Sequence, residues 1–335
     1  SQLAGRYEHD GLSTCILKGQ GNLLNYPEHL RKRRQCGDID VWTVCKNGIP
    51  IAVQTAKDKA EYVESHGRKA VIEYVKMQHR LEGNKEKPVI RYHHIESPKI
   101  DGTEVEVHFR PCYAHSPLRN WRMQRWFKDH ADVCMKNKTH MGFAVPTASV
   151  NVVYQMCHLF SHYFDEGLGL RQLMDYYFAL RVWHNDVMEC KDLQSQGMWS
   201  EGLGTPVLSK EEVMSVLCAF GMGKFAGAVM FVLHEVFAMP TQLSINDEQL
   251  TIDDCLWLLC EPNEKEGKKL LEEIMKGGNF GQYDTRDAAL KKGGMMKHGL
   301  WKLKRVMRLI SSYPEEALWE PVFRVWHLGW RKMNG

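Results

Sequence analysis

Two aspartates separated by a single residue are the strongest chemical feature of the sequence. Asp38 and Asp40 belong to the segment Gly-Asp-Ile-Asp-Val-Trp, which alternates as a β-strand does. Alternate side chains of a strand share a face, so the two carboxylates point the same way, about 6–7 Å apart. They repel and raise each other's pKa, a cost that makes sense where a divalent cation lies between them. Mg²⁺ prefers oxygen ligands and commonly takes carboxylates together with substrate phosphates.

A third acidic side chain is expected from the strand predicted over residues 103–109. This strand would carry Glu104, Glu106 and His108 on one face and apolar residues on the other. The alternative is that this face is solvated and that the two aspartates merely begin an edge strand, because Asp-x-Asp often occurs by chance.

A lysine and a glycine-rich turn precede the aspartates. Lys18-Gly19-Gln20-Gly21 follows a β-prone run over residues 13–17 and leads into a helix expected to begin within residues 21–26. Glycines after a strand let backbone N–H groups approach a phosphate, and the lysine adds a point charge. A glycine turn alone is usually only a turn. The order of strand, glycine turn, helix, Asp-x-Asp strand and acidic strand is much rarer.

Two pairs of polar side chains recur at helical spacing in the second half of the chain. His158 and His162 share a face of one predicted helix, and Arg171 and Asp175 share a face of the next. A second domain that closes a nucleotide cleft would use them on phosphates or the acceptor. A helix-packing network explains them as well, with an Arg–Asp pair worth about a few tenths of a kcal/mol. Zinc is less expected here because a third ligand is not evident.

Arg34 and His108 are further candidates. Arg34 precedes Asp38 and could neutralise a triphosphate, whereas residues 31–33 read as a solvated basic loop, which is also the alternative for Arg34. His108 shares the face of Glu106 and could contact the substrate, or it could be an ordinary strand histidine with its hydrogen bonds satisfied.

The elements that position these residues divide into an α/β part and a helical part. Strands are predicted over residues 13–17, 38–44, 89–95 and 103–109. The last two form a hairpin around Ser-Pro-Lys-Ile-Asp-Gly, and a helix is predicted over residues 51–65, with Gly67 as its stop. Further helices are predicted over residues 149–164, 170–183, 210–219, 224–237, 252–259, 264–275 and 297–310. The prediction is an α+β protein, with a mixed sheet and flanking helices in residues 1–115 and a mainly helical domain in residues 116–335. The boundary is expected between residues 112 and 147.

Composition agrees with a two-domain cytoplasmic protein. The 335 residues are 44% hydrophobic and 25% charged, with a formal net charge of +3. Residues 1–145 contain 24 Lys and Arg against 17 Asp and Glu, which weakly favours a polyphosphate or nucleic-acid partner. The ten cysteines form no C-x-x-C pair, so we expect reduced thiols.

Neither a signal peptide nor a membrane span is expected. The longest apolar region, residues 213–233, contains Lys224 and several glycines, which favours a buried helical hairpin. The sequence starts without Met in a polar stretch, so a preceding segment is expected.

Several of these motifs together resemble a known family. The runs CILKGQGNLLNYP, RRQCGDIDVW, EVEVHFRP and HLFSHYFDEGLGLRQLMDYY look like an uncharacterised nucleotidyltransferase family of Bacteroides-type bacteria, in the DNA-polymerase-β-like superfamily. The resemblance covers most of the chain. The sequence is similar, more distantly, to antibiotic nucleotidyltransferases and nucleotidyltransferase toxins. It departs from the superfamily's usual Gly-Ser motif, because Gln20 follows Gly19.

The resemblance implies a polymerase-β-like fold with Asp38, Asp40 and Glu106 as ligands of two Mg²⁺ ions and Glu104 as the rival third acid. An NMP, expected to be AMP, would pass from an NTP to a hydroxyl or phosphate acceptor with release of pyrophosphate. The acceptor would be a small molecule, such as an antibiotic or sugar phosphate, or an RNA end; DNA and membrane partners are not expected. The residues expected to bind the nucleotide are Lys18, Gly19, Gln20, Arg34, His158, His162, Arg171 and Asp175.

Two other functions stay open. A non-catalytic nucleotide-binding or interaction protein could retain the same fold, although the presence of all three acids argues against it. A metal-dependent phosphohydrolase would release phosphate rather than pyrophosphate, and would usually show more histidine–aspartate ligand motifs.

Overall fold

The computed structural model describes residues 2–54, 60–84, 86–195, 207–237, 259–277 and 294–334. The chain divides into two compact units. The first unit contains Ser1–Tyr113, Gln124–Thr147 and Trp326–Gly335, and the second contains Ala114–Met123 and Ala148–Val325. The division falls within two helices, α4 (Pro117–Asp129) and α14 (Pro314–Asn334).

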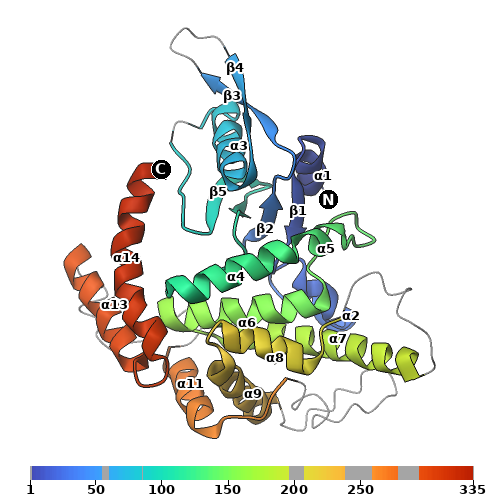
Figure 1. Ribbon diagram of the computed structural model, residues 1–335, viewed down its shortest axis with the longest axis vertical. Helices are drawn as coiled ribbons and strands as arrows, with labels where there is room; N and C mark the ends of the chain where they lie inside the picture. Colours follow the sequence, from blue (N-terminus) through green and yellow to red (C-terminus); the bar gives the residue numbers. More distant parts are fainter. Residues whose placement is uncertain are drawn as a thin grey trace. The chain divides into compact units, whose positions relative to one another are not determined.

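The first unit is built on a four-stranded sheet with the strand order β1-β2-β6-β5 (Figure 1). The strands are β1 (Ser13–Ile16), β2 (Ile39–Val44), β6 (Thr103–His108) and β5 (His94–Ile100). β2 runs parallel to β6, whereas β1 is antiparallel to β2 and β5 is antiparallel to β6. The sheet is therefore mixed, and the expected α+β class is confirmed.

Apolar residues at alternate strand positions form one face of this sheet. Val41 on β2 lies opposite Val107 on β6, and both are fully buried. They belong to a core that also contains residues of α3 (Gly67–Leu81) and α1 (Gln2–His9). Fully burying such a side chain contributes about 1.5–3 kcal/mol. Because a slip of one residue would turn these valines away from the core, the apolar face fixes which side chains remain on the other face.

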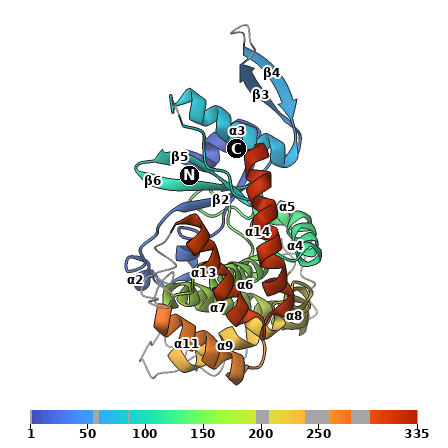
Figure 2. The same cartoon turned by 90° about the vertical axis from the view of Figure 1, so that its left-hand side faces the viewer.

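Residues 51–65 form strands, and the helix predicted there is wrong. β3 (Ile49–Gln54) and β4 (Ala60–Ser65) pair antiparallel as a separate two-stranded ribbon (Figure 2). The sequence Ile-Pro-Ile-Ala-Val from residue 49 places β-branched side chains at alternate positions, which favours a strand. Gly67, with a φ of 56°, begins α3 instead of ending a helix.

β5 and β6 form the expected hairpin, but β5 lies later in the chain than the predicted strand over residues 89–95. The turn is Asp101-Gly102 alone, and the preceding Ser-Pro-Lys-Ile belongs to β5. Asp101 and Gly102 have positive φ values of 49° and 78°, as a two-residue Asp-Gly hairpin turn requires. The register is irregular around Pro98, which cannot donate a ladder hydrogen bond.

The second unit is helical, as expected. Most of the predicted ranges are found within a residue or two of their ends, but α7 continues past Trp183 to Ser195. The predicted helix over residues 252–259 lies outside the described residues, apart from Leu259. The helices here are α6 (Ala148–Asp165), α7 (Leu170–Ser195), α8 (Lys210–Ala219), α9 (Gly223–Phe237), α11 (Glu264–Gly277) and α13 (Met295–Leu309), with parts of α4 and α14.

The sequence did not predict α1, α2 (Glu28–Arg31), α3, α4, α5 (Ala131–Lys136) or α14. α4 carries a recognisable start signal, because Ser116 and Pro117 occupy the positions that favour a helix N-terminus. Within the part of the chain that is described, none of the helices has the length and hydropathy needed to cross a membrane.

Candidate functional site

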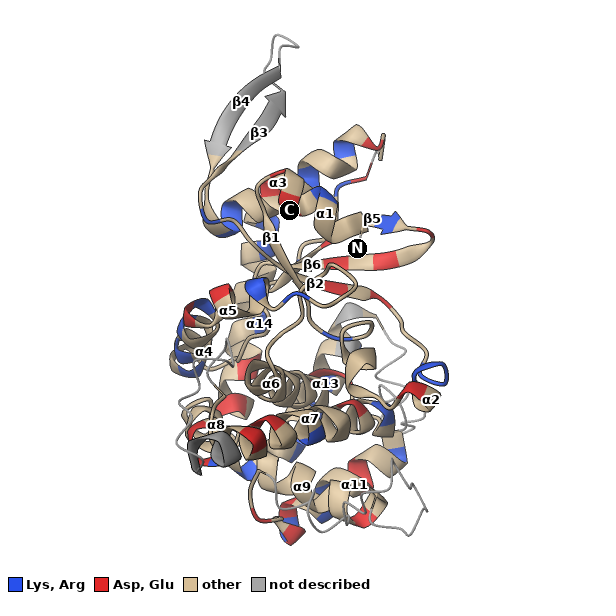
Figure 3. Cartoon of the chain, turned by 90° about the vertical axis from the view of Figure 1, so that its right-hand side faces the viewer, with Lys and Arg blue, Asp and Glu red and all other residues tan. Residues whose placement is uncertain are grey.

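Asp40 and Glu106 face each other across two parallel strands. They are Cα partners in the register of β2 and β6, so their side chains project from the same face of the sheet. Asp40 is fully buried, and the Glu106 side chain is 26% exposed. One ligand atom from each of them and one from His108 lie within 4.8 Å of one another. Red bands on β2 and β6 mark their acidic residues in Figure 3.

The ammonium group of Lys18 lies beside both aspartates. Its Nζ is 3.0 Å from Asp40 Oδ1 and 4.0 Å from Asp38 Oδ2. The turn that carries Lys18 is tied to β2, because the Leu17 N–H donates to the Asp40 carbonyl at 3.0 Å. Asp38 lies just before β2, and its side chain is 38% exposed. The chain therefore balances its own aspartates with a cation from the glycine turn.

His108 connects the carboxylates of the two strands. Its Nε2 donates to Asp40 Oδ1 at 3.0 Å and lies 3.4 Å from Glu106 Oε2. The imidazole is buried, and His108 is the Cα partner of Trp42 on β2. His108 therefore contacts both Asp40 and Glu106 and orients their carboxylates. Its predicted contact with substrate remains a prediction.

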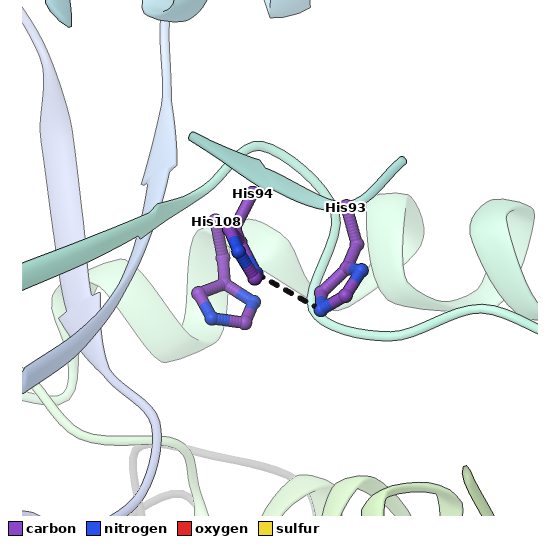
Figure 4. A group of neighbouring side chains, drawn as sticks. All are labelled: His93, His94 and His108. Atoms are coloured by element: carbon purple, nitrogen blue, oxygen red, sulfur yellow. Dashed lines mark hydrogen bonds between the residues drawn. The ribbon is translucent and has the colours of Figure 1, made fainter. Parts of the chain in front are cut away.

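The first residue of β5, His94, and the residue before it, His93, add two histidines to this group. His94 is the Cα partner of His108, and its Nδ1 is 3.3 Å from Glu106 Oε2. Its neighbour His93 places Nε2 3.1 Å from His94 Nδ1, and Figure 4 shows the three rings turned toward one another. The sequence predicted no role for either histidine, although both lie within the strand predicted over residues 89–95, because their approach to Glu106 depends on the pairing of β5 with β6.

Nearby cations set the protonation state of the carboxylates. Burial would raise the pKa of Asp40, but Lys18 and His108 hold it at about 2. Burial would likewise raise the pKa of Glu106, but the hydrogen bond from His108 and the electrostatic effects of His94 and His108 together lower it. Burial and then repulsion from Asp40 raise the pKa of Asp38. Asp40 and Glu106 are therefore ionised at neutral pH.

The carboxylates and burial also shift the pKa values of the basic groups nearby. Burial would lower the pKa of Lys18, but the carboxylates of Asp40 and Asp38 raise it. Burial would lower the pKa of His108 too, yet its bonds to Asp40 and Glu106 raise it to about 9. For His94, burial and the charge of His108 lower the pKa to about 3. The His94 ring is therefore neutral at neutral pH, and its contact with Glu106 is not an ion pair.

The acids retain capacity for a cation. Asp40 Oδ2 is buried and has no hydrogen-bond partner among the described residues. A buried carboxylate oxygen without a partner is costly, and a divalent cation satisfies it. A Glu106 oxygen lies within 4.8 Å of an Asp40 oxygen, and Asp38 is near enough that, besides burial, the charges of both raise its pKa. Carboxylate oxygens are the ligands that Mg²⁺ prefers. The residues present fit a magnesium site.

Glu104, the rival third acid, lies apart from this group. Its side chain is 71% exposed, and its Oε1 accepts from Lys99 Nζ at 3.0 Å. Glu104 and Glu106 are both acids on one face of β6, but of these two only Glu106 is the partner of Asp40. This placement favours Glu106 as the third ligand.

The glycine turn needs its glycines, but the helix after it is shorter than predicted. Gly19 has a φ of 57°, and a Cβ on Gly21 would lie 2.8 Å from the carbonyl oxygen of Ile16. Gln20 is half-buried between them. In place of the helix expected to begin within residues 21–26 there is a single 3₁₀ turn, η1 (Asn22–Asn25), so any grip on phosphate depends on the turn rather than on a helix dipole.

Two arginines between η1 and β2 are held by local contacts. Arg34 is half-buried, and its guanidinium donates to Cys36 Sγ at 3.3 Å. Arg31, expected in a solvated loop, donates instead to the carbonyl of Tyr26 at 2.9 Å, so that expectation is wrong. Arg31 lies at the end of the short helix α2 (Glu28–Arg31) and ties it back to η1.

The remaining predicted site residues belong to the second unit. On α6, His158 and His162 share a hydrogen bond between their Nε2 atoms at 3.1 Å. On α7, Arg171 is exposed and Asp175 is buried. The predicted faces are therefore present, and the nucleotide-binding role of these four residues remains a prediction.

Similarity to known proteins rests on a family model. The model of an uncharacterised nucleotidyltransferase family matches residues 1–197, which is more than half of the chain. The matched segment contains Lys18, Asp38 and Asp40 together with Glu106 and His108. No curated protein and no solved structure matches the chain.

Proposed function

The chain belongs to the uncharacterised nucleotidyltransferase family, and we propose that it transfers an NMP, AMP by preference, from a nucleoside triphosphate to an acceptor hydroxyl or phosphate. Pyrophosphate is the leaving group. The acceptor is a small molecule, such as an antibiotic or a sugar phosphate, or an RNA end. The observation that carries the proposal is the pairing of Asp40 with Glu106 across parallel strands, beside Asp38 and Lys18.

Asp38, Asp40 and Glu106 are the residues that would hold two Mg²⁺ ions. Bound there, the ions stabilise charge on the attacking and leaving oxygens of the phosphoryl group. Asp40 is suited to this role because His108 and Lys18 fix one of its oxygens and leave the other without a partner among the described residues. Asp38 and Glu106 are more exposed than Asp40, which suits residues that face substrate.

Lys18 and the turn after it bind the triphosphate in this proposal. The Lys18 ammonium is already held next to the aspartates, so it can pair with phosphate oxygens brought to the same place. The positive φ of Gly19 bends the backbone there and lets N–H groups approach an anion. Arg34, which lies before β2, adds a second positive charge.

Glu106 is the residue that accepts the proton of the acceptor hydroxyl. Its lowered pKa keeps it ionised, and its side chain is open to solvent where that of Asp40 is closed. As the acceptor oxygen bonds to the α-phosphorus, the bond to pyrophosphate breaks and the hydroxyl proton passes to the carboxylate.

The test is a transfer assay with α-labelled and γ-labelled NTPs, Mg²⁺ and a panel of aminoglycosides, lincosamides, sugar phosphates and total tRNA. Label from the α-position should enter an acceptor while the γ-label leaves as pyrophosphate. The Asp38→Asn and Asp40→Asn variants should each transfer at least about 100-fold more slowly. Transfer by both variants at the parent rate contradicts the proposal.

The same assay separates the other functions. Release of free γ-phosphate without labelled acceptor indicates a phosphohydrolase. Calorimetric binding of NTP without turnover on any acceptor indicates a nucleotide-binding protein that keeps the fold. If RNA is the acceptor, its binding should weaken steeply with salt, whereas binding of a neutral small molecule should not.

A further inference from the structure

His93, His94 and His108 form a compact group that nucleotidyl transfer does not require as a whole. Their ring centroids are 4.4 Å apart for His93–His94 and 5.2 Å apart for the other two pairs. One nitrogen of each ring lies within 4.8 Å of one nitrogen of each of the others. Figure 4 shows the rings converging from the start of β5 and the end of β6. We refer to these three residues as the histidine cluster.

His108 is oriented as a metal-bound histidine is. Its Nε2 donates to Asp40 Oδ1 at 3.0 Å, which leaves Nδ1 as its other nitrogen. Nδ1 is buried and has no hydrogen-bond partner among the residues that the structure describes. Histidines that ligate metals almost always donate their second N–H to a carboxylate, a carbonyl or water, which fixes the tautomer and the ring. Asp40 supplies that carboxylate.

The other two rings have a spacing that suits a shared ion. His93 Nε2 and His94 Nδ1 are 3.1 Å apart. Two nitrogens bound at about 2.0–2.1 Å to a tetrahedral Zn²⁺ lie about 3.3–3.4 Å from each other. His93 Nδ1 is also buried without a partner in the described part of the chain. Little movement is needed for the two rings to bind one ion.

We propose that the histidine cluster binds a divalent transition metal, with Zn²⁺ as the ion that its ligand chemistry fits best. Imidazole nitrogens suit Zn²⁺ and its neighbours in the first row, whereas carboxylates suit Mg²⁺. Three protein nitrogens leave a fourth position open, as in catalytic zinc sites. Binding at His108 Nδ1 releases any proton that it carries.

This site goes beyond the proposed transfer function and does not depend on it. Its ligands are nitrogens of the histidine cluster, while the transfer site uses the oxygens of Asp38, Asp40 and Glu106. The two meet at His108, whose Nε2 bonds to Asp40 and lies next to Glu106. An ion in the cluster therefore locks the ring that orients both carboxylates.

The probe is Co²⁺, titrated without nucleotide into the full chain after treatment with a chelator. Co²⁺ should give the visible absorption of a tetrahedral site, Zn²⁺ should remove it, and an excess of Mg²⁺ should leave it unchanged. His93→Gln and His94→Gln should each weaken Co²⁺ binding at least about tenfold. His9→Gln, which changes a histidine whose side chain is 89% exposed, and Asp38→Asn should bind Co²⁺ as the parent does.

Three results overturn the proposal. They are the absence of a tetrahedral Co²⁺ spectrum in the parent, loss of that spectrum on addition of Mg²⁺, and unchanged Co²⁺ affinity in both His93→Gln and His94→Gln. The test of the parent spectrum does not depend on whether any variant folds. Since no step uses nucleotide, failure of the transfer assay leaves this test unaffected, and failure here leaves the transfer proposal standing.

Discussion

Each unit of the protein buries a histidine against a carboxylate. The two groups differ in whether every carboxylate oxygen has a hydrogen-bond partner. In the first unit, His108 bonds to Asp40 and lies beside Glu106. In the second unit, His115 Nδ1 lies 2.9 Å from Glu316 Oε1, and both residues are buried. By residue type and burial alone the two groups look alike.

Both oxygens of the carboxylate in the second unit accept hydrogen bonds from the backbone. Glu316 Oε1 accepts from the His115 N–H at 2.5 Å, and Oε2 accepts from the Ser116 N–H at 3.4 Å. These bonds satisfy backbone donors at the start of α4, which is the work of a helix cap. In the first unit, by contrast, Asp40 Oδ2 has no hydrogen-bond partner among the described residues. The comparison teaches that a buried carboxylate oxygen left without a partner, rather than burial of charge, distinguishes the candidate site.

The largest expected effect would separate the two groups by activity. Asp40→Asn should lower the rate of nucleotidyl transfer at least about 100-fold. Glu316→Gln should leave the rate per folded molecule unchanged, because Glu316 serves the helix start. Steady-state transfer rates, divided by the folded fraction from circular dichroism, measure both. A loss of rate with Glu316→Gln that exceeds its loss of folded protein would break the comparison.

The effect of Glu316→Gln should instead be a loss of stability. Removing one partner of a buried charge pair commonly costs about 3–5 kcal/mol, so Glu316→Gln should lower the free energy of unfolding by an amount of that order. Urea unfolding of the parent and the variant measures it. Glu315→Gln is the matched control, since the neighbouring Glu315 side chain is 40% exposed. Equal losses of unfolding free energy in the two variants would show that Glu316 does not stabilise the start of α4 more than its exposed neighbour does.

A smaller effect should follow from removing Lys18, the cation beside the aspartates. Lys18→Gln should tighten Mg²⁺ binding to the nucleotide-free protein by at least about fivefold, because a charge at about 4 Å is worth about 1 kcal/mol even in water. The KM for NTP should rise at the same time. Isothermal titration with Mg²⁺ tests the first part, and Lys99→Gln, which removes the exposed partner of Glu104, is the control. An unchanged Mg²⁺ affinity would show that the Lys18 ammonium does not compete with Mg²⁺ for the carboxylates of Asp38 and Asp40.

The smallest effect is on pH dependence. Although burial lowers the pKa of His115, its bond to Glu316 raises it above the ordinary value of 6.5. Its contribution to stability is therefore fully present below pH 6.5 and is lost as the pH rises through the folded-state pKa. The stability difference between the parent and His115→Gln should accordingly shrink as the pH rises above 6.5. Urea unfolding across that range measures it, and a difference that grows with pH contradicts the assignment.

Local sequence patterns predicted the strands of the four-stranded sheet and most helices of the second unit, but not how the strands pair. The alternation of Asp38–Val44 and of residues 103–109 indicated β2 and β6 because strand periodicity is visible within a few residues. The partnership of Asp40 with Glu106 depends on a parallel register between distant segments, which no local pattern contains. The contact of Lys18 with Asp40 depends on the same packing.

Two predictions were wrong although the sequence contained the signal for the correct structure. They are the range of β5 and the helix over residues 51–65. The Asp101-Gly102 pair is a strong hairpin turn, and centring the hairpin on it pairs Ile100 with Thr103. That register alone would place Ile95 opposite His108, and the shift between Ser97 and Ile100 brings His94 there instead. The β-branched alternation from Ile49 likewise indicated a strand, although a helix was predicted over residues 51–65. The unused atoms Asp40 Oδ2 and His108 Nδ1 were beyond sequence reasoning, because a missing partner is a property of three-dimensional packing.

The most direct test of the central claim is a matched pair of substitutions on β6. Glu106→Gln and Glu104→Gln each remove one negative charge from the same face of the strand, two residues apart, and only Glu106 is the partner of Asp40. At saturating Mg²⁺ and NTP, the initial rate of α-label transfer should fall at least about 100-fold in Glu106→Gln and stay at the parent value in Glu104→Gln. Equal rates in the two variants would contradict the account.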